Sequence, residues 1–246
     1  MSTFIPLCVP FERRSEAAAG GASFDQIEKC WLCPADSLLQ VLPFVPYRYR
    51  PDRKPPFIRP WMVPQALWGR NLRALLEPDD WKHIRKDCYA RAGSRCRVCG
   101  RRGPQWPVEA DEGWAYDDET RVQTLKGVIA LCPDCHAVRH WGRTIATGKH
   151  DEALAWMEEV NGWTRAQALE CGNLAMEQWH QRSRFDDWRC DISWVERHYG
   201  VKATARGAAL AIERNRDFVS QARAQFGDVN SAPKRSGYLQ HLINER

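Results

Sequence analysis

Apolar side chains recur at three- and four-residue spacing through most of the chain beyond residue 65, which is the periodicity of helices with one buried face. The first such segment follows Asp79 and Asp80, and either side chain can cap the N-terminus of a helix. Its apolar positions Trp81, Ile84 and Cys88 share one helical face. We therefore predict a helix that begins at this acidic pair and packs that face against a core.

The same spacing predicts three later helices, over Asp151–Val160, Thr164–Arg184 and Ala203–Phe226. The pair Asn161-Gly162 is expected to end the first of them, since glycine readily takes the left-handed conformation that follows a helix. Beyond residue 226 only a short turn is predicted, at Tyr238–Ile243.

The first 64 residues follow a different pattern. Pro6 and Pro10 exclude a helix over Phe4–Phe11, so this stretch is predicted to be extended. A short helix is predicted over Arg13–Ala19, where Gly20-Gly21 would end it. Residues 46–64 hold six prolines with aromatic side chains between them, a composition typical of an extended linker lying on a surface.

Together these patterns predict an α+β protein that is mainly helical, with a small N-terminal α/β domain. The 246 residues suffice for one or two domains. The predicted division is a small domain at 1–45, a Pro-rich linker at 46–64, a helical domain at 65–200 that contains a cysteine-rich module (96–140), and a C-terminal helix and tail at 201–246.

Composition narrows the class of protein further. No apolar run approaches the roughly 18 residues needed to cross a bilayer. The first residues also lack the basic start of a secretory signal. These features predict a soluble, cytoplasmic protein without a membrane partner, in which the ten cysteines are reduced or metal-bound rather than paired as disulfides.

Charge is distributed unevenly, although the formal net charge is only +5. Residues 106–120 contain acids and no Lys or Arg. The segment before them, here called the basic stripe, is the candidate for phosphate contacts and comprises Lys82, Arg85, Lys86, Arg91, Arg95, Arg97, Arg101 and Arg102. This arrangement suits a protein that holds a polyanion against a metal ion, but two solvated faces of opposite charge would give the same pattern.

Two Cys-x-x-Cys sequences give the strongest chemical signal, Cys96 with Cys99 and Cys132 with Cys135. Two intervening residues allow both sulfurs of a tight turn to face one ion, and two such turns complete a tetrahedral site. We predict a structural zinc ion on all four thiolates, because this ligand set leaves no position open for water. The alternative is two unrelated pairs of buried cysteines.

A third Cys-x-x-Cys, at Cys30 and Cys33, has no partner pair nearby and is not predicted to bind metal. The segment around it, residues 7–34, resembles the small domain often attached to plasmid TraC-type primases. The matching positions are Leu7, Val9, Pro10, Phe11, Ala17, Gly21, Ala22, Asp25, Lys29, Trp31 and Pro34. This resemblance implies a DNA-processing setting on a plasmid or mobile element.

Residues 96–140 resemble the zinc-stabilised HNH endonucleases, which have a ββα-metal fold. The resemblance rests on the two Cys-x-x-Cys turns, the strand Val108–Glu112 between them and the sequence Leu131-Cys132-Pro133-Asp134-Cys135-His136. It implies an HNH-like module in which the strand meets a helix that begins at the second Cys-x-x-Cys.

The catalytic positions of this family are occupied differently here. The alignment places Asp111 where the family has a metal ligand, Glu112 where it has the general-base His, and Gly127 where it has an Asn. A shift of one residue would place Asp111 at the base position instead. A carboxylate with an ordinary pKa near 4.3 is a weaker base than His, and losing a positioned base costs about 10²–10⁴-fold in rate.

A cation site could nevertheless remain. His136 and His140 are four residues apart and so share one face of the predicted helix. With Asp111 they would form a possible catalytic site for Mg, Mn or a second zinc. Alternatively, His136 braces the hairpin through a hydrogen bond and His140 lies at the surface.

The sequence therefore predicts a DNA-binding protein whose zinc-stabilised HNH-like module is a degenerate nuclease acting in DNA recognition. One alternative is an active metal-dependent endonuclease that uses Glu112 or Asp111 as its base. Another is a DNA-recognition subunit of a larger nucleoprotein complex, such as a type IV CRISPR effector. RNA in place of DNA is also compatible with the sequence.

Overall fold

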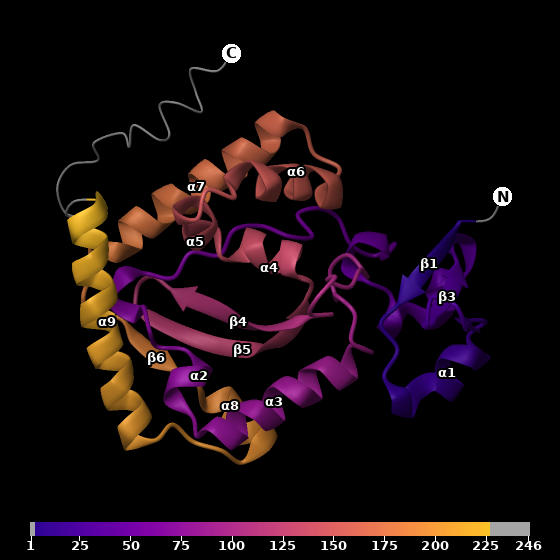
Figure 1. The fold of residues 1–246 in the computed structure, drawn as a ribbon, viewed down its shortest axis with the longest axis horizontal. Coiled ribbons are helices and arrows are strands. Elements are labelled where there is room, and N and C mark those ends of the chain that lie inside the picture. Colours follow the sequence, from indigo (N-terminus) through magenta and orange to yellow (C-terminus); the bar gives the residue numbers. More distant parts are fainter. Residues whose placement is uncertain (1–2, 227–246) are drawn as a thin grey trace.

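The computed structural model describes residues 3–226. Its first unit is a three-stranded antiparallel sheet in the order β1-β3-β2, seen at the right of Figure 1. The elements are β1 (Phe4–Leu7), α1 (Arg14–Ala19), β2 (Ser23–Asp25) and β3 (Cys30–Pro34). The predicted extended start is confirmed for β1, and the predicted short helix is confirmed at α1.

The N-terminal unit has a core of its own. Leu7 and Val9 pack with Val41, Phe44 and Val45, which come from and directly follow the 3₁₀ segment Ala35–Phe44. Burial of such side chains is worth about 1.5–3 kcal/mol each, so this cluster stabilises the N-terminal unit.

A second sheet lies at the centre of the molecule. β4 (Glu109–Asp117) and β5 (Val122–Leu131) form an antiparallel hairpin, and β6 (Arg189–Asp191) adds to β5 in parallel. Asp117 closes the hairpin turn by accepting hydrogen bonds from the backbone N–H groups of Glu119 and Thr120. The strand predicted at Val108–Glu112 begins one residue later, at Glu109, and is the first part of a longer strand.

Helices cover this sheet on both faces. In Figure 1, α3 lies below the hairpin and α4 lies above it, with α6 and α7 farther out and α9 along one end. Their bounds are α2 (Leu72–Leu75), α3 (Pro78–Arg91), α4 (Pro133–Arg139), α5 (Trp141–Ala146), α6 (His150–Asn161), α7 (Arg165–Ser183), α8 (Ser193–Tyr199) and α9 (Ala205–Phe226).

The predicted helix ends are confirmed at several points and corrected at one. α6 ends at Asn161, and Gly162 takes the left-handed conformation with φ of 66°. Thr164 caps α7 together with Gln167 in a capping box. Neither Asp79 nor Asp80 caps α3, because Pro78 is already its first residue and Glu77 stands at the cap position.

Residues 46–64, here called the strap, cross from the N-terminal unit to the far end of the central sheet (Figure 1). The strap is fastened by backbone hydrogen bonds, Arg48 N–H to Val98 O and Trp61 N–H to Arg139 O. The buried Asn161 side chain accepts from the N–H groups of residues 57 and 58 and donates to the Ile58 carbonyl. These hydrogen bonds therefore hold the strap in a fixed position at the edge of the core.

The fold is thus a mixed α+β arrangement with two small sheets, and helices make up about half of the described chain. Within residues 3–226, no helix combines the length and apolar character needed to span a bilayer. The turn predicted at Tyr238–Ile243 lies outside the described residues.

Candidate metal centres

The four cysteines of the two Cys-x-x-Cys sequences come together in one buried cluster, with their sulfur atoms within 4.8 Å of one another. Cys96 and Cys99 lie on the turn after α3, while Cys132 and Cys135 begin α4. The Sγ atoms of Cys99 and Cys132 are 3.6 Å apart. Four buried thiols at this spacing could hold a metal ion such as zinc.

Local backbone geometry explains why the cysteines converge. Gly100 has φ of 78° and donates its N–H to the Cys96 carbonyl, which closes the first turn. Arg97 N–H donates to the Ala130 carbonyl at the end of β5, so the first turn is aligned beside the second. Pro133 occupies the first turn of α4, where its missing N–H costs nothing.

Hydrogen bonds within the cluster shift the pKa values of its cysteines in opposite directions: they raise those of Cys99 and Cys135 and lower that of Cys96. Burial disfavours the Cys96 thiolate, but hydrogen bonds from Cys132, Cys135 and Cys99 outweigh it and lower the pKa of Cys96. The indole N–H of Trp156 donates to Cys135 Sγ at 3.2 Å. Donation from a neighbouring N–H to a ligand sulfur is a common outer contact of metal–thiolate sites.

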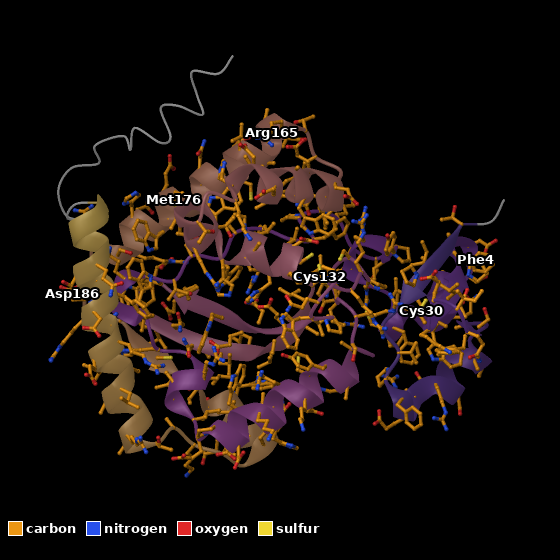
Figure 2. All side chains as sticks on the ribbon, in the orientation of Figure 1. Phe4, Cys30, Cys132, Arg165, Met176 and Asp186 are labelled. Atoms are coloured by element: carbon orange, nitrogen blue, oxygen red, sulfur yellow. The ribbon has the colours of Figure 1, made fainter. Side chains whose placement is uncertain are left out.

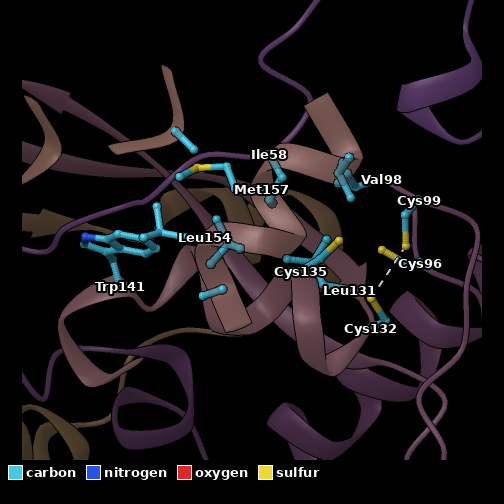
Figure 3. Close-up of a cluster of buried hydrophobic side chains, with 14 residues drawn as sticks. Ile58, Cys96, Val98, Cys99, Leu131, Cys132, Cys135, Trp141, Leu154 and Met157 are labelled. Carbon is cyan, nitrogen blue, oxygen red and sulfur yellow. Dashed lines mark hydrogen bonds between the residues drawn. The ribbon is translucent and has the colours of Figure 1, made fainter. Parts of the chain in front are cut away.

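The cysteine cluster forms one end of the largest described core. Figure 3 shows the four sulfurs beside Leu131 and Val98, with Leu154, Met157 and Trp141 continuing the core away from them. Cys30 belongs to the N-terminal unit, at some distance from the labelled Cys132 in Figure 2. Neither Cys30 nor Cys33 joins a group of metal-ligating side chains within the described residues.

A second group of metal-ligating side chains joins Asp111, on β4, with His136 and His140 at α4 and its C-terminus. Asp111 Oδ1 is 3.4 Å from His140 Nε2 and 3.8 Å from His136 Nε2. Asp111 is only 5% exposed, whereas the His140 side chain is 47% exposed. The group therefore has a buried carboxylate and one side open to solvent.

His136 is held by a carboxylate on its other nitrogen. Glu109 Oε2 lies 2.8 Å from His136 Nδ1, and this contact lowers the pKa of Glu109. A carboxylate that accepts from Nδ1–H leaves Nε2 free as a ligand and fixes the orientation of the ring. The His136 ring thereby presents Nε2 toward Asp111 and could hold a cation with it.

Arg139 binds the other oxygen of Asp111. Its Nε is 2.9 Å from Asp111 Oδ2, and its Nη2 donates to the Glu112 carbonyl at 3.3 Å. The guanidinium lies 4.6 Å from the Trp61 ring centre, so the strap covers it. Although burial opposes ionisation, His140 and Arg139 hold the pKa of Asp111 below its ordinary value.

Glu112 points to the opposite face of the hairpin, as alternation along a strand requires. Its carboxyl accepts the Leu72 N–H of α2 at 2.7 Å, and burial raises its pKa to about 8. The structure does not bring Glu112 together with His136 and His140. Gly127, at the position predicted for the Asn, pairs with Gly113 and offers no side chain.

Much of the basic stripe is bonded to the protein itself. Arg95 and Arg97 donate to the carbonyls of Gly100 and Pro43, Arg101 pairs with Glu159 at 2.6 Å, and Arg102 donates to the carbonyls of Gly93 and Ser94. Arg91 pairs with Asp87, and the Arg85 guanidinium lies 5.9 Å from the Trp81 ring centre.

The exposed side chains of Lys82 and Lys86 differ from these arginines. Within the described part of the chain, neither has a hydrogen bond or an ion pair. They are four residues apart and so share one face of α3. The two lysines are therefore exposed members of the stripe whose side chains are free to contact an outside phosphate.

Sequence reasoning missed Glu109 and Arg139. The positions of the two residues gave a signal, because Glu109 lies two residues before Asp111 on the same strand face and Arg139 three residues after His136 on the same helix. Only the pairing of β4 with β5 and the packing of α4 on this hairpin show that both residues reach the same site.

Comparisons with protein-family models, with curated proteins and with solved structures found no match to this chain.

Proposed function

We propose that this chain is a DNA-binding protein whose HNH-like module holds a structural zinc ion and a second cation but lacks a general base at the second site. One observation carries this proposal: Asp111, His136 and His140 converge, while Glu112 lies on the opposite face of the hairpin. The setting on a plasmid or mobile element rests on the N-terminal resemblance alone.

The order of elements supports the HNH-like part of the proposal. A hairpin, β4 and β5, is followed directly by α4, and α4 begins at the second pair of cysteines. His136 lies one residue after Cys135, so a metal on the four sulfurs would fix the helix that carries it. The zinc would serve the fold, because four thiolates leave no position for a reacting water.

The chemistry of the second site favours binding over cleavage. A divalent cation bound there would supply Lewis-acid stabilisation to a phosphate oxygen. Cleavage also needs a group that takes a proton from water. Asp111 is a poor candidate because its pKa is lowered and Arg139 already holds one of its oxygens. Glu112 is bound to α2 on the other face of the hairpin.

The test is a supercoiled-plasmid nicking assay with Mg²⁺ and with Mn²⁺, run beside a gel-shift assay. We expect a shifted duplex and no nicking by the wild-type chain, and a weaker Mn²⁺-dependent shift for Asp111→Ala. Asp134→Ala is the matched control, since Asp134 is an exposed acid on the same helix. Absence of any duplex shift would contradict the proposal.

A second candidate function is an active metal-dependent endonuclease. The 47% exposure of the His140 side chain favours it, because one of the three candidate ligands is open to solvent. Nicking that both Asp111→Ala and His136→Ala abolish, with Asp134→Ala unaffected, would replace the first candidate with this one. Asp111 would then be the base to examine, since Glu112 does not reach the site.

A further inference from the structure

Arg139 occupies an unusual position for a residue beside a cation site. It is 14% exposed, it takes one oxygen of Asp111, and it leaves the other oxygen directed at His140 and His136. Its backbone carbonyl accepts the Trp61 N–H, and the Trp61 ring lies against its guanidinium. The Arg139 side chain is therefore held against Asp111 from two sides.

The charges around the site determine what Arg139 does there. The carboxylates of Asp111 and Glu109 face it from β4, while Arg139 and the two histidines face it from α4 and its C-terminus. Arg143 on α5 is exposed and close enough to Glu109 to interact with it electrostatically. A cation would bind the neutral form of both histidines, so the charges it meets from Asp111, Glu109 and Arg139 sum to a single net negative charge.

A single net negative charge is small for a site that binds a divalent cation. Sites with few formal negative charges bind such ions weakly, and a bound divalent ion would reverse the sign of the site. The loaded site, flanked by Arg139 and Arg143, would then attract an anion. Because the His140 side chain is 47% exposed, the anion would approach the cation from the side of His140.

We propose that Arg139 makes cation binding and phosphate binding interdependent at this site. By neutralising Asp111, it keeps the affinity of the free protein for divalent cations low, and it joins the bound cation in attracting a nucleic-acid phosphate. This inference rests on the proposed function and adds a positioning residue to it. Because coupling between two ligands is reciprocal, DNA must also tighten the binding of the cation.

The experiment measures Mn²⁺ binding by the full, zinc-loaded chain, using electron paramagnetic resonance of free Mn²⁺ with and without a saturating DNA duplex. For the wild-type chain we expect the duplex to lower the Kd for Mn²⁺ by about fivefold or more. Arg139→Gln should bind Mn²⁺ more tightly than wild type without DNA, and the effect of the duplex should fall below about twofold.

Two further variants make the result specific. Arg139→Lys keeps the positive charge but not the two-pronged contact, so it should retain most of the coupling even if Arg139→Gln folds poorly. Arg206→Gln, at an exposed position on α9, is the matched control and should behave as wild type. Circular dichroism and zinc content verify that each variant is folded.

The contrary outcomes are distinct. If wild-type chain binds both Mn²⁺ and the duplex but each independently of the other, the inference fails and the proposed function stands. Equal loss of coupling in Arg139→Lys and Arg139→Gln would also overturn it, because charge would not be the cause. If the wild-type chain binds neither, the proposed function fails together with the inference.

Discussion

Burial raises the pKa of Glu112 to about 8, while Asp111, the next residue on β4, has a lowered pKa. The two carboxyls differ because strand alternation sends them to opposite faces of the hairpin. Asp111 meets Arg139 and the histidines, whereas the Glu112 carboxyl lies beside α2 and accepts the Leu72 N–H. The pKa values of neighbouring acids on one strand are therefore shifted in opposite directions.

Glu112 should make stability depend on pH. Its folded-state pKa is above its ordinary value, so the folded state favours the protonated form and loses stability as pH rises from about 4.5 to about 8. Glu112→Gln imitates the protonated form and can still accept the Leu72 N–H. In urea unfolding we expect equal stability at pH 5 and a gain of about 1–3 kcal/mol for the variant at pH 9.

The same measurement on Glu119→Gln provides the control, since Glu119 is exposed in the hairpin turn. If wild type and Glu112→Gln differ in free energy of unfolding by the same amount at pH 5 and at pH 9, Glu112 is solvated rather than buried.

At the scale of the elements, the position of the strap depends on the side chain of one residue, Asn161. Asn161 at the end of α6 makes three hydrogen bonds to the backbone of residues 57 and 58. Asn161→Ala should therefore lower the free energy of unfolding by about 1–3 kcal/mol and speed proteolysis within residues 46–64. Limited proteolysis with mass spectrometry measures this, and Asn173→Ala on the exposed face of α7 is the control.

For α3 the structure refines which residues of the basic stripe to test. Lys82→Glu with Lys86→Glu should weaken duplex binding and reduce the slope of log K against log salt by about 2, since two phosphate contacts are lost. Fluorescence anisotropy at several salt concentrations measures the slope. An unchanged slope would remove α3 from the DNA interface.

The sequence predicted those elements whose signals are local. The apolar spacing located α3, α6, α7 and α9, and a glycine located the end of α6. The strands β2 and β3 were not located individually, and the second strand of the hairpin, β5, was only implied by the family resemblance. β6 was missed, because it has only three residues and joins β5 through a contact between distant parts of the chain. The convergence of the cysteines followed from their spacing, but the place of Glu112 depended on packing against α2 that no local pattern records.

At the scale of the whole molecule, the cysteine cluster joins segments that are distant in sequence. The first turn contacts β5 and the strap, and the thiol of Cys8 in the N-terminal unit donates to the Cys96 carbonyl at 3.5 Å. Cys132→Ser should therefore release one zinc ion and abolish cooperative unfolding of the region around it.

Zinc content by atomic absorption and thermal unfolding by circular dichroism measure these effects, and Cys171→Ser on α7 serves as the control because Cys171 is only half-buried. A folded Cys132→Ser chain with unchanged zinc content would contradict the assignment of the four cysteines to a metal.

The attachment of the strap also has a consequence for how the chain is made. Residues 57 and 58 bind a side chain 104 and 103 positions later, so their partner is not available until Asn161 has left the ribosome. During that interval the tyrosines, phenylalanine and tryptophan of the strap have no partner helix to cover them, and such exposed apolar segments are what chaperones bind. Residues 46–64 can therefore dock on the protein only late in synthesis. Slowing translation just before Asn161 should prolong the association of a chaperone with the nascent chain.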